Sequence, residues 1–312
     1  MLPLGRGRQR TASCRIYPFL LVFLLLASRA QAQSRAGSFD IRGGSYEASG
    51  GVAVPGTTGV LFVDDSRGRH VFWMLFDKNG VQKSDATAVP LGVATTDLED
   101  ITTDGTFFYA VGSQSKGGNR TTIGLVRFRF DPISRQASDV QGIADLAGFI
   151  EREVPALAPG RRPWGTVLNI EGLVWDPVGQ RLLFGLREPL GGDEALVVAV
   201  RLPSVRAGRF SFDNLRPGDV SLLRVATERL GVRGLGYDAA AKRVLAILGA
   251  TSSVPLRERF ELVSWDPAAG TSTTRIATLP AALKPEGVTR VTVDGRSHTL
   301  ILCDTGRYLF LD

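Results

Sequence analysis

The sequence predicts an all-β fold: a β-propeller of five blades, each with four antiparallel strands. Turn-forming residues are abundant, with 36 Gly and 16 Pro, and helical periods are few. Short apolar runs recur around Asp-Pro turns, as in residues 169–188, which have a Trp-Asp-Pro turn at 175–177. Similar starts occur at residues 50, 99, 171, 233 and 286. Repeats of four short strands at such intervals are typical of propellers.

The strands expected in each repeat are apolar runs bounded by turn residues. In the first two repeats they lie at residues 50–54, 60–63, 71–76, 81–89, then 98–103, 106–111 and 123–130. In the third and fourth they lie at residues 171–175, 182–186, 195–200, 220–225, then 232–238, 243–248, 260–265 and 273–278. The fifth repeat has three, at residues 285–288, 299–302 and 308–311.

The two ends of the domain are expected to meet in one blade. The fifth repeat stops after three strands, and residues 38–46 form an unassigned strand before the first repeat. Pairing this N-terminal strand with the last blade would close the ring and remove an open sheet edge. Two insertions interrupt the repeats: residues 203–219, and a short amphipathic helix at about 140–154. A sixth blade in the longer gap is the alternative.

Residues 1–32 have the pattern of a secretory signal peptide. Four arginines precede the apolar run 19–27, and Ala30-Gln31-Ala32 supplies small residues for cleavage. An uncleaved anchor is the alternative, but this run is shorter than the ~20 residues that span a bilayer. We therefore expect residues 33–312 to be a single propeller domain, exported to the periplasm or secreted, without stable membrane insertion after cleavage.

Charge and cysteine content narrow the function classes. Residues 1–32 hold five arginines and no acid, so the 37 basic residues of the chain fall to 32 after cleavage, against 31 acidic ones. This balance offers no concentrated basic face, and we expect no nucleic-acid partner. Cys303 is then the remaining cysteine and lies in an apolar run, which favours a buried thiol. We expect a monomer.

Polar residues should converge at one end of the central channel. Successive strands of a blade alternate in direction, so the entry to the innermost strand and the exit from the second strand share a face. The entries carry Glu99, Asp100, Glu171, Arg233 and Glu286. The exits carry Asp64, Asp65, Arg187, Glu188 and Asp304. These ten residues are the candidate site.

The chemistry of this set allows several roles. Crowded carboxylates raise one another's pKa or attract a cation, and oxygen ligands without Cys or His suit Ca²⁺ or Mg²⁺, with Glu99, Glu171 and Glu286 as ligands. Arg187 and Arg233 would instead pair with the carboxylates or hold an anionic ligand. A structural alternative is that the glutamates accept backbone N–H bonds between blades. The two histidines, His70 and His298, lie in different strands and offer little for a His-based site.

Three of the starts resemble a bacterial family of secreted propellers of unknown function. They are LEDITTDG at 98–105, NIEGLVWDP at 169–177 and KPEGVTRV at 284–291. The match covers most of residues 98–312. The first repeat departs from it, with Gly50 where an acid is expected, and the fourth repeat has Arg233 at this position. This family is similar to propellers described as esterase-like or phytase-like and, more distantly, to metal-dependent lactonases. The resemblance implies a site at the channel mouth with acidic metal ligands.

Two functions are expected from these features. The first is an exported propeller that binds a small, anionic or metal-chelated ligand at the Glu99, Glu171 and Glu286 mouth. In this case the protein would hydrolyse an ester or phosphoester with a metal-activated water, and the three glutamates are the candidate catalytic residues. The second is a non-catalytic module that recognises a protein or a cell-envelope polymer on the same face.

Overall fold

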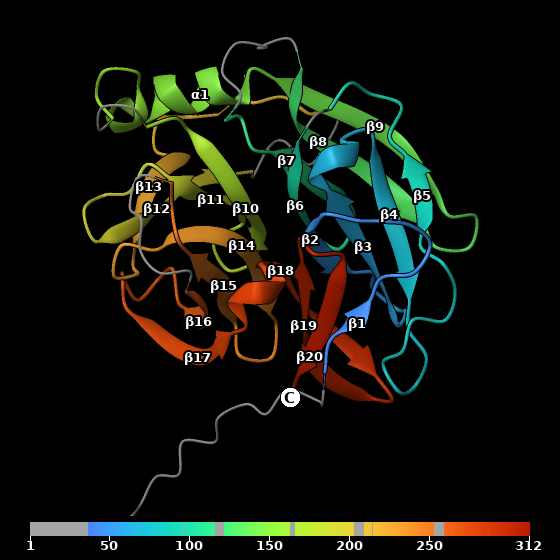
Figure 1. Ribbon diagram of the computed structural model, residues 1–312. Coiled ribbons are helices and arrows are strands. Elements are labelled where there is room, and N and C mark those ends of the chain that lie inside the picture. Colours follow the sequence, from blue (N-terminus) through green and yellow to red (C-terminus); the bar gives the residue numbers. More distant parts are fainter. Residues whose placement is uncertain are drawn as a thin grey trace, which may run out of the picture. The chain divides into compact units, whose positions relative to one another are not determined.

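The computed structural model describes residues 37–95, 97–115, 122–162, 166–202, 209–213, 215–252 and 259–312. The predicted signal peptide lies outside these residues. The described part of the chain belongs to one compact unit, residues 31–312. Its strands pair into five antiparallel sheets of four strands, which follow one another in a ring (Figure 1). The predicted five-bladed β-propeller is therefore confirmed.

Four blades are formed by consecutive strands. Blade 1 contains β2 (Ala48–Ala53), β3 (Gly59–Asp64), β4 (His70–Leu75) and β5 (Thr87–Pro90). Blade 2 contains β6 (Leu98–Thr103), β7 (Phe108–Gly112), β8 (Ile123–Asp131) and β9 (Gln136–Ala144). Blade 3 contains β10 (Asn169–Asp176), β11 (Arg181–Glu188), β12 (Glu194–Arg201) and β13 (Val220–Ala226). Blade 4 contains β14 (Gly231–Asp238), β15 (Arg243–Gly249), β16 (Phe260–Trp265) and β17 (Thr273–Leu279).

Blade 5 combines residues from both ends of the domain. It contains β18 (Pro285–Val293), β19 (Arg296–Cys303), β20 (Arg307–Leu311) and β1 (Phe39–Asp40). Phe39 lies opposite Tyr308, and their rings stack with centroids 5.3 Å apart. β1 is shorter than the strand expected at 38–46, and Ile41 and Tyr46 beyond it are buried in the core.

The apolar core lies between neighbouring blades. Five buried clusters each join two adjacent sheets, for example blades 3 and 4 through Val174, Leu183, Leu235 and Trp265. Cys303 is buried in the cluster between blades 4 and 5. This arrangement follows from the sequence, because the inner strands are apolar on both faces and need a sheet on each side.

The predicted helical insertion is shorter than expected and begins later. Residues 136–144 form β9, with Ile143 opposite Leu125, and helix α1 spans Leu146–Glu153. Asp145 follows the strand directly and caps the helix, since its side chain accepts a hydrogen bond from the Gly148 amide. In the described part of the chain, no helix is long and apolar enough to cross a membrane.

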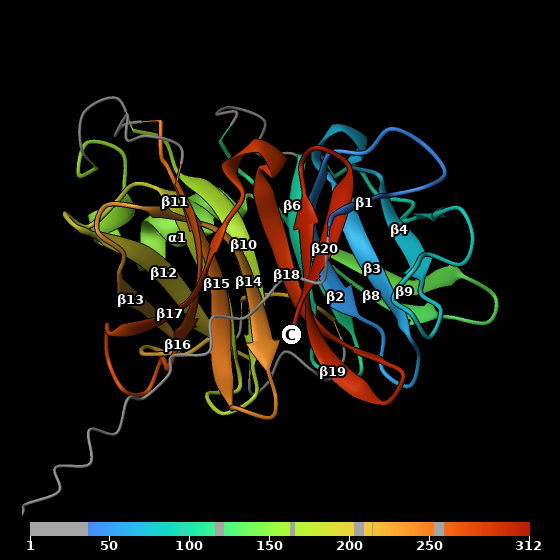
Figure 2. The same ribbon diagram turned by 60° about the horizontal axis from the view of Figure 1, so that its bottom comes forward.

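The five innermost strands, β2, β6, β10, β14 and β18, contact their neighbours around the centre of the ring (Figure 2). Glycines allow this close approach: a Cβ on Gly234 would lie 1.8 Å from the Glu286 carbonyl oxygen. Asp100 fills part of the space that they leave. Its carboxylate accepts hydrogen bonds from the backbone N–H groups of Leu173 on β10 and Leu235 on β14, at 2.7 and 3.0 Å.

Candidate functional site at the channel mouth

Every innermost strand has a β-bulge near its start. Pairing with the second strand skips one residue between Ala48 and Gly50, and the same shift recurs in the other four blades. The extra residues are Ser49, Glu99, Glu171, Arg233 and Glu286. A bulge interrupts the alternation of a strand and re-aims the side chain of its extra residue. Ser49, rather than Gly50, is thus the equivalent of the glutamates in blade 1.

Four of the five bulge residues line one cavity of about 440 Å³: Glu99, Glu171, Arg233 and Glu286. Three residues at the ends of second strands line it as well: Arg187 near the end of β11, and Asp65 and Asp304 directly after β3 and β19. The structure therefore brings seven of the ten candidate residues together. We call this space the mouth cavity.

Glu171 lies at the centre of an ion-pair network. Its Oε1 accepts hydrogen bonds from Asn169 Nδ2 and Arg187 Nη1, both at 2.9 Å. Its Oε2 lies 3.0 Å from Arg233 Nη1, and Arg233 Nη2 in turn donates to Glu286 Oε1. Glu171 and Glu286 are 5% and 6% exposed, so these contacts are made with little water around them. Charge-assisted bonds of this kind are stronger than hydrogen bonds between neutral groups.

Glu99 has a different environment from Glu171. Burial raises the pKa of Glu99 well above its usual range, and the nearby carboxylates of Glu171, Asp97 and Asp65 raise it further, while Arg233 opposes them. Its neighbour Asp97 accepts a hydrogen bond from Ser113 Oγ. The environment therefore favours the protonated form of Glu99, beside an ion-paired Glu171.

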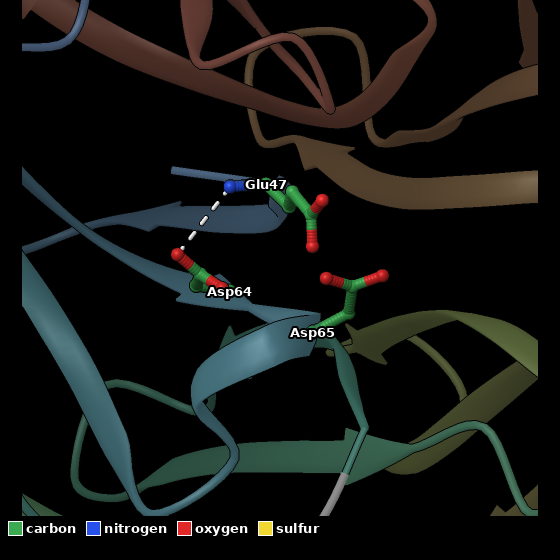
Figure 3. Close-up of side chains that lie close together, drawn as sticks. All are labelled: Glu47, Asp64 and Asp65. Carbon is green, nitrogen blue, oxygen red and sulfur yellow. Dashed lines mark hydrogen bonds between the residues drawn. The ribbon is translucent and has the colours of Figure 1, made fainter. Parts of the chain in front are cut away.

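Glu47, Asp64 and Asp65 bring three carboxylates close together at the end of β3 (Figure 3). Burial, a hydrogen bond with Glu47 and repulsion by Glu47, Asp304 and Asp64 raise the pKa of Asp65 to about 7. Asp64 is committed to the turn, since it accepts from the Ser66 amide at 3.0 Å and from the Glu47 amide at 3.3 Å. Asp65 and Glu47 therefore form a hydrogen-bonded carboxyl pair beside Asp64.

Three of the ten candidate residues lie outside the lining of the mouth cavity. Asp64 is fully buried and caps the turn after β3. Asp100 is also fully buried, and it accepts hydrogen bonds from three backbone N–H groups. It therefore has a structural role between blades, which was the alternative considered for the glutamates. Glu188 is 4% exposed and accepts a hydrogen bond from Ser252 Oγ at 2.7 Å.

The carboxylates of Glu99, Glu171 and Glu286 do not fit the divalent cation that the sequence suggested. Two of the three expected ligands, Glu171 and Glu286, are joined by the guanidinium of Arg233. A metal bound between these carboxylates would have to displace a buried cation that is tethered to the chain. A divalent metal is therefore not part of the function proposed for this site.

Six residues of the cavity lining were not among the candidates predicted from the sequence. Asp97, Asn169 and Lys284 all lie two positions before a bulge residue, and Ser115, Ala250 and Phe260 complete the lining. Lys284 Nζ pairs with Asp304 Oδ2 at 2.8 Å. Aligning the repeats on the bulge, with Glu47 as the blade 1 equivalent of these three, would have found them.

Comparisons with known proteins identify no family. No family model and no curated protein matches the chain. The soluble aldose sugar dehydrogenase of Escherichia coli is similar in structure, with a TM-score of 0.48 and 10% identity over 88% of this chain and 98% of that chain. A glucose dehydrogenase has a TM-score of 0.46 and 11% identity, covering 88% and 99%.

Kuenenia stuttgartiensis hydrazine synthase has a TM-score of 0.36 and 14% identity; the match covers 84% of this chain and 57% of that chain. Similarity at these levels carries no argument about activity. The fold assignment rests on the strand pairing described above.

Proposed function

We propose that the protein binds a small polar ligand, neutral or positively charged, in the mouth cavity, and that Glu99 donates a proton or hydrogen bond to it. The observation that carries this proposal is the repeated bulge, which turns four charged side chains from four blades into one cavity. Bulges are frequent next to active sites because they re-aim side chains. A bulge used only for packing would not need charged residues in four blades.

The charge of the cavity decides between ligand classes. Its lining contains six acidic residues and three basic ones. Each basic residue is ion-paired with a carboxylate of the same cavity: Arg187 with Glu171, Arg233 with Glu171 and Glu286, and Lys284 with Asp304. An anionic ligand would have to break these pairs and enter a field of surplus negative charge. A neutral or cationic ligand with hydrogen-bonding groups could bind without breaking these ion pairs and without being repelled by the negative charge.

The contrast between Glu99 and Glu171 supports acid catalysis. Neighbouring carboxyls whose environments separate their protonation states are a frequent arrangement for a general acid beside a carboxylate. Ester hydrolysis uses such an acid, because the oxygen of the leaving group must take up a proton. A carboxylic ester suits the cavity better than a phosphoester, which would add negative charge.

A ligand and substrate screen tests the proposal. Thermal unfolding would be followed with neutral polyols, amines, carboxylates and phosphates, and hydrolysis with chromogenic carboxylic esters and phosphoesters. We expect neutral or cationic compounds to raise the midpoint, and E99Q to abolish ester turnover while the chain stays folded. E228Q, in an exposed ion pair outside the cavity, is the control. Selective binding of phosphates, or turnover unaffected by E99Q, would contradict the proposal.

The proposed site of action is outside the cytoplasm. This part of the proposal is supported by the leader pattern of residues 1–32. Fractionation of cells that produce the full chain with a C-terminal tag should place a shortened form, starting near residue 33, in the periplasm or medium. A full-length product in the cytoplasm would contradict it.

A further inference from the structure

Arg233 is held by carboxylates from neighbouring blades. Its Nη1 lies 3.0 Å from Glu171 Oε2 of blade 3, and its Nη2 donates to Glu286 Oε1 of blade 5. Burial lowers the pKa of Arg233, and Glu171 and Glu99 oppose this effect. The Arg233 side chain is 11% exposed, so most of its hydration has been replaced by these glutamates. The guanidinium bridges Glu171 and Glu286, where a bound cation would neutralise these two carboxylates.

The bulge residue of blade 4 differs from those of the other four blades. Blades 2, 3 and 5 place a glutamate at the bulge, and blade 1 places Ser49, whose hydroxyl donates to the Glu47 carbonyl oxygen at 3.2 Å. Blade 4, between two of the glutamate blades, places the arginine. An arginine remains protonated in proteins and cannot dissociate from the site as a metal ion can.

We infer that Arg233 determines the specificity of the mouth cavity by acting as a tethered cation in place of a divalent ion, so that the native site takes its ligand without one. The same geometry implies a latent site. Removing the guanidinium would leave the carboxylates of Glu171 and Glu286 facing a vacated space, and carboxylate oxygens are ligands that suit a hard cation such as Ca²⁺.

The test compares substitutions that remove the positive charge at position 233, keep it there, or remove the charge of the other arginine paired with Glu171. R233S introduces the residue that blade 1 has at its bulge, and R233K keeps a cation there. R187S removes the other arginine paired with Glu171 but leaves Arg233 in place. All chains would carry D65N, so that the Glu47, Asp64 and Asp65 group does not contribute. Calcium and magnesium chloride would be titrated by calorimetry.

We expect saturable binding of a single calcium ion by R233S, its loss when E171Q is added, and no binding by the R233K, R187S and D65N chains. If R233S does not fold, R233Q replaces it. A folded R233S or R233Q chain that binds no calcium would overturn the inference. So would calcium binding by the D65N chain that is lost on adding E286Q. The inference concerns the cavity of the proposed function, but the titration needs no ligand, so failure of the ligand screen and failure of this test are distinguishable.

Discussion

Glu99 and Glu171 occupy equivalent bulges, yet their surroundings give them different chemistry. Glu171 contacts two guanidinium groups and an amide, whereas Glu99 faces carboxylates. Identity and position in the repeat are the same, so the difference comes from what the neighbouring blades place beside each one. The proposed acid role of Glu99 depends on this asymmetry.

Breaking the network at Glu171 should be costly. E171Q leaves Arg187 and Arg233 close together without their shared carboxylate, and removing one partner of a buried pair costs about 3–5 kcal/mol. We expect a loss of this size in the free energy of unfolding, measured with urea. E228Q is the matched control: it breaks the pair with Arg259, but its side chain is 78% exposed, so we expect a change below about 1 kcal/mol. Equal effects of the two substitutions would contradict the buried network.

Asp65 should make the stability of the protein depend on pH. Its pKa rises from 3.8 to about 7 on folding, so between these values the unfolded chain releases a proton that the folded chain retains. Wild-type stability should therefore fall as the pH rises through this window, and D65N should remove this loss. Urea unfolding is expected to show D65N gaining on the wild type from about pH 4 to about pH 8. A difference that is constant with pH would show that Asp65 titrates normally.

At the scale of single strands, the register distinguishes adjacent candidate residues that the sequence could not. Three pairs of adjacent candidates occur: Asp64 and Asp65, Glu99 and Asp100, and Arg187 and Glu188. In each pair one residue lines the cavity and its neighbour is buried in the structure. The topology predicted the correct face, but a shift of one residue exchanges the two sides of a strand. The choice within each pair therefore needed the register.

Asp100 should hold three blades together. Its Oδ1 accepts from the Ile101 amide at 2.8 Å, and its Oδ2 accepts from the Leu173 and Leu235 amides. D100N keeps the size but turns an NH₂ group toward at least one of these donors, and each buried group left unsatisfied costs about 1–3 kcal/mol.

Urea unfolding should show this loss for D100N. Asp131 also accepts backbone N–H bonds, but in an exposed turn, so D131N is expected to change stability by less than about 1 kcal/mol. If D100N were as stable as the wild type, the packing of the blades would not depend on this carboxylate.

At the scale of the whole molecule, the sequence predicted the blade number from its repeats, because each apolar strand run was bounded by turn residues. It failed where periodicity was ambiguous. Residues 140–144 have apolar spacing that fits a helix, yet they extend β9 because β8 offers a partner along its whole length. Tertiary pairing of this kind cannot be read from a local period.

The N-terminal segment before blade 1 should be needed for a stable ring. Ile41 and Tyr46 are 4% and 5% exposed, and the Tyr46 ring packs against Phe62 and Phe72. A chain that starts at Ala48 loses these contacts and the pairing of β1, and large core deletions cost about 3–5 kcal/mol each. Compared with a chain that starts at Ser38, we expect it to aggregate in size-exclusion chromatography or to unfold at much lower urea. Equal stability of the two chains would contradict this role.

The proposed function depends most on the protonation of Glu99 in the mouth cavity. A ¹³C NMR titration of the side-chain carboxyl groups measures it directly, with the Glu99 resonance assigned as the one lost in E99Q. We predict that this resonance titrates well above the usual glutamate pKa of 4.5, because Glu99 is desolvated and faces the carboxylates of Glu171, Asp97 and Asp65. Titration near 4.5 would show an ordinary surface carboxylate and would contradict the proposed proton donor.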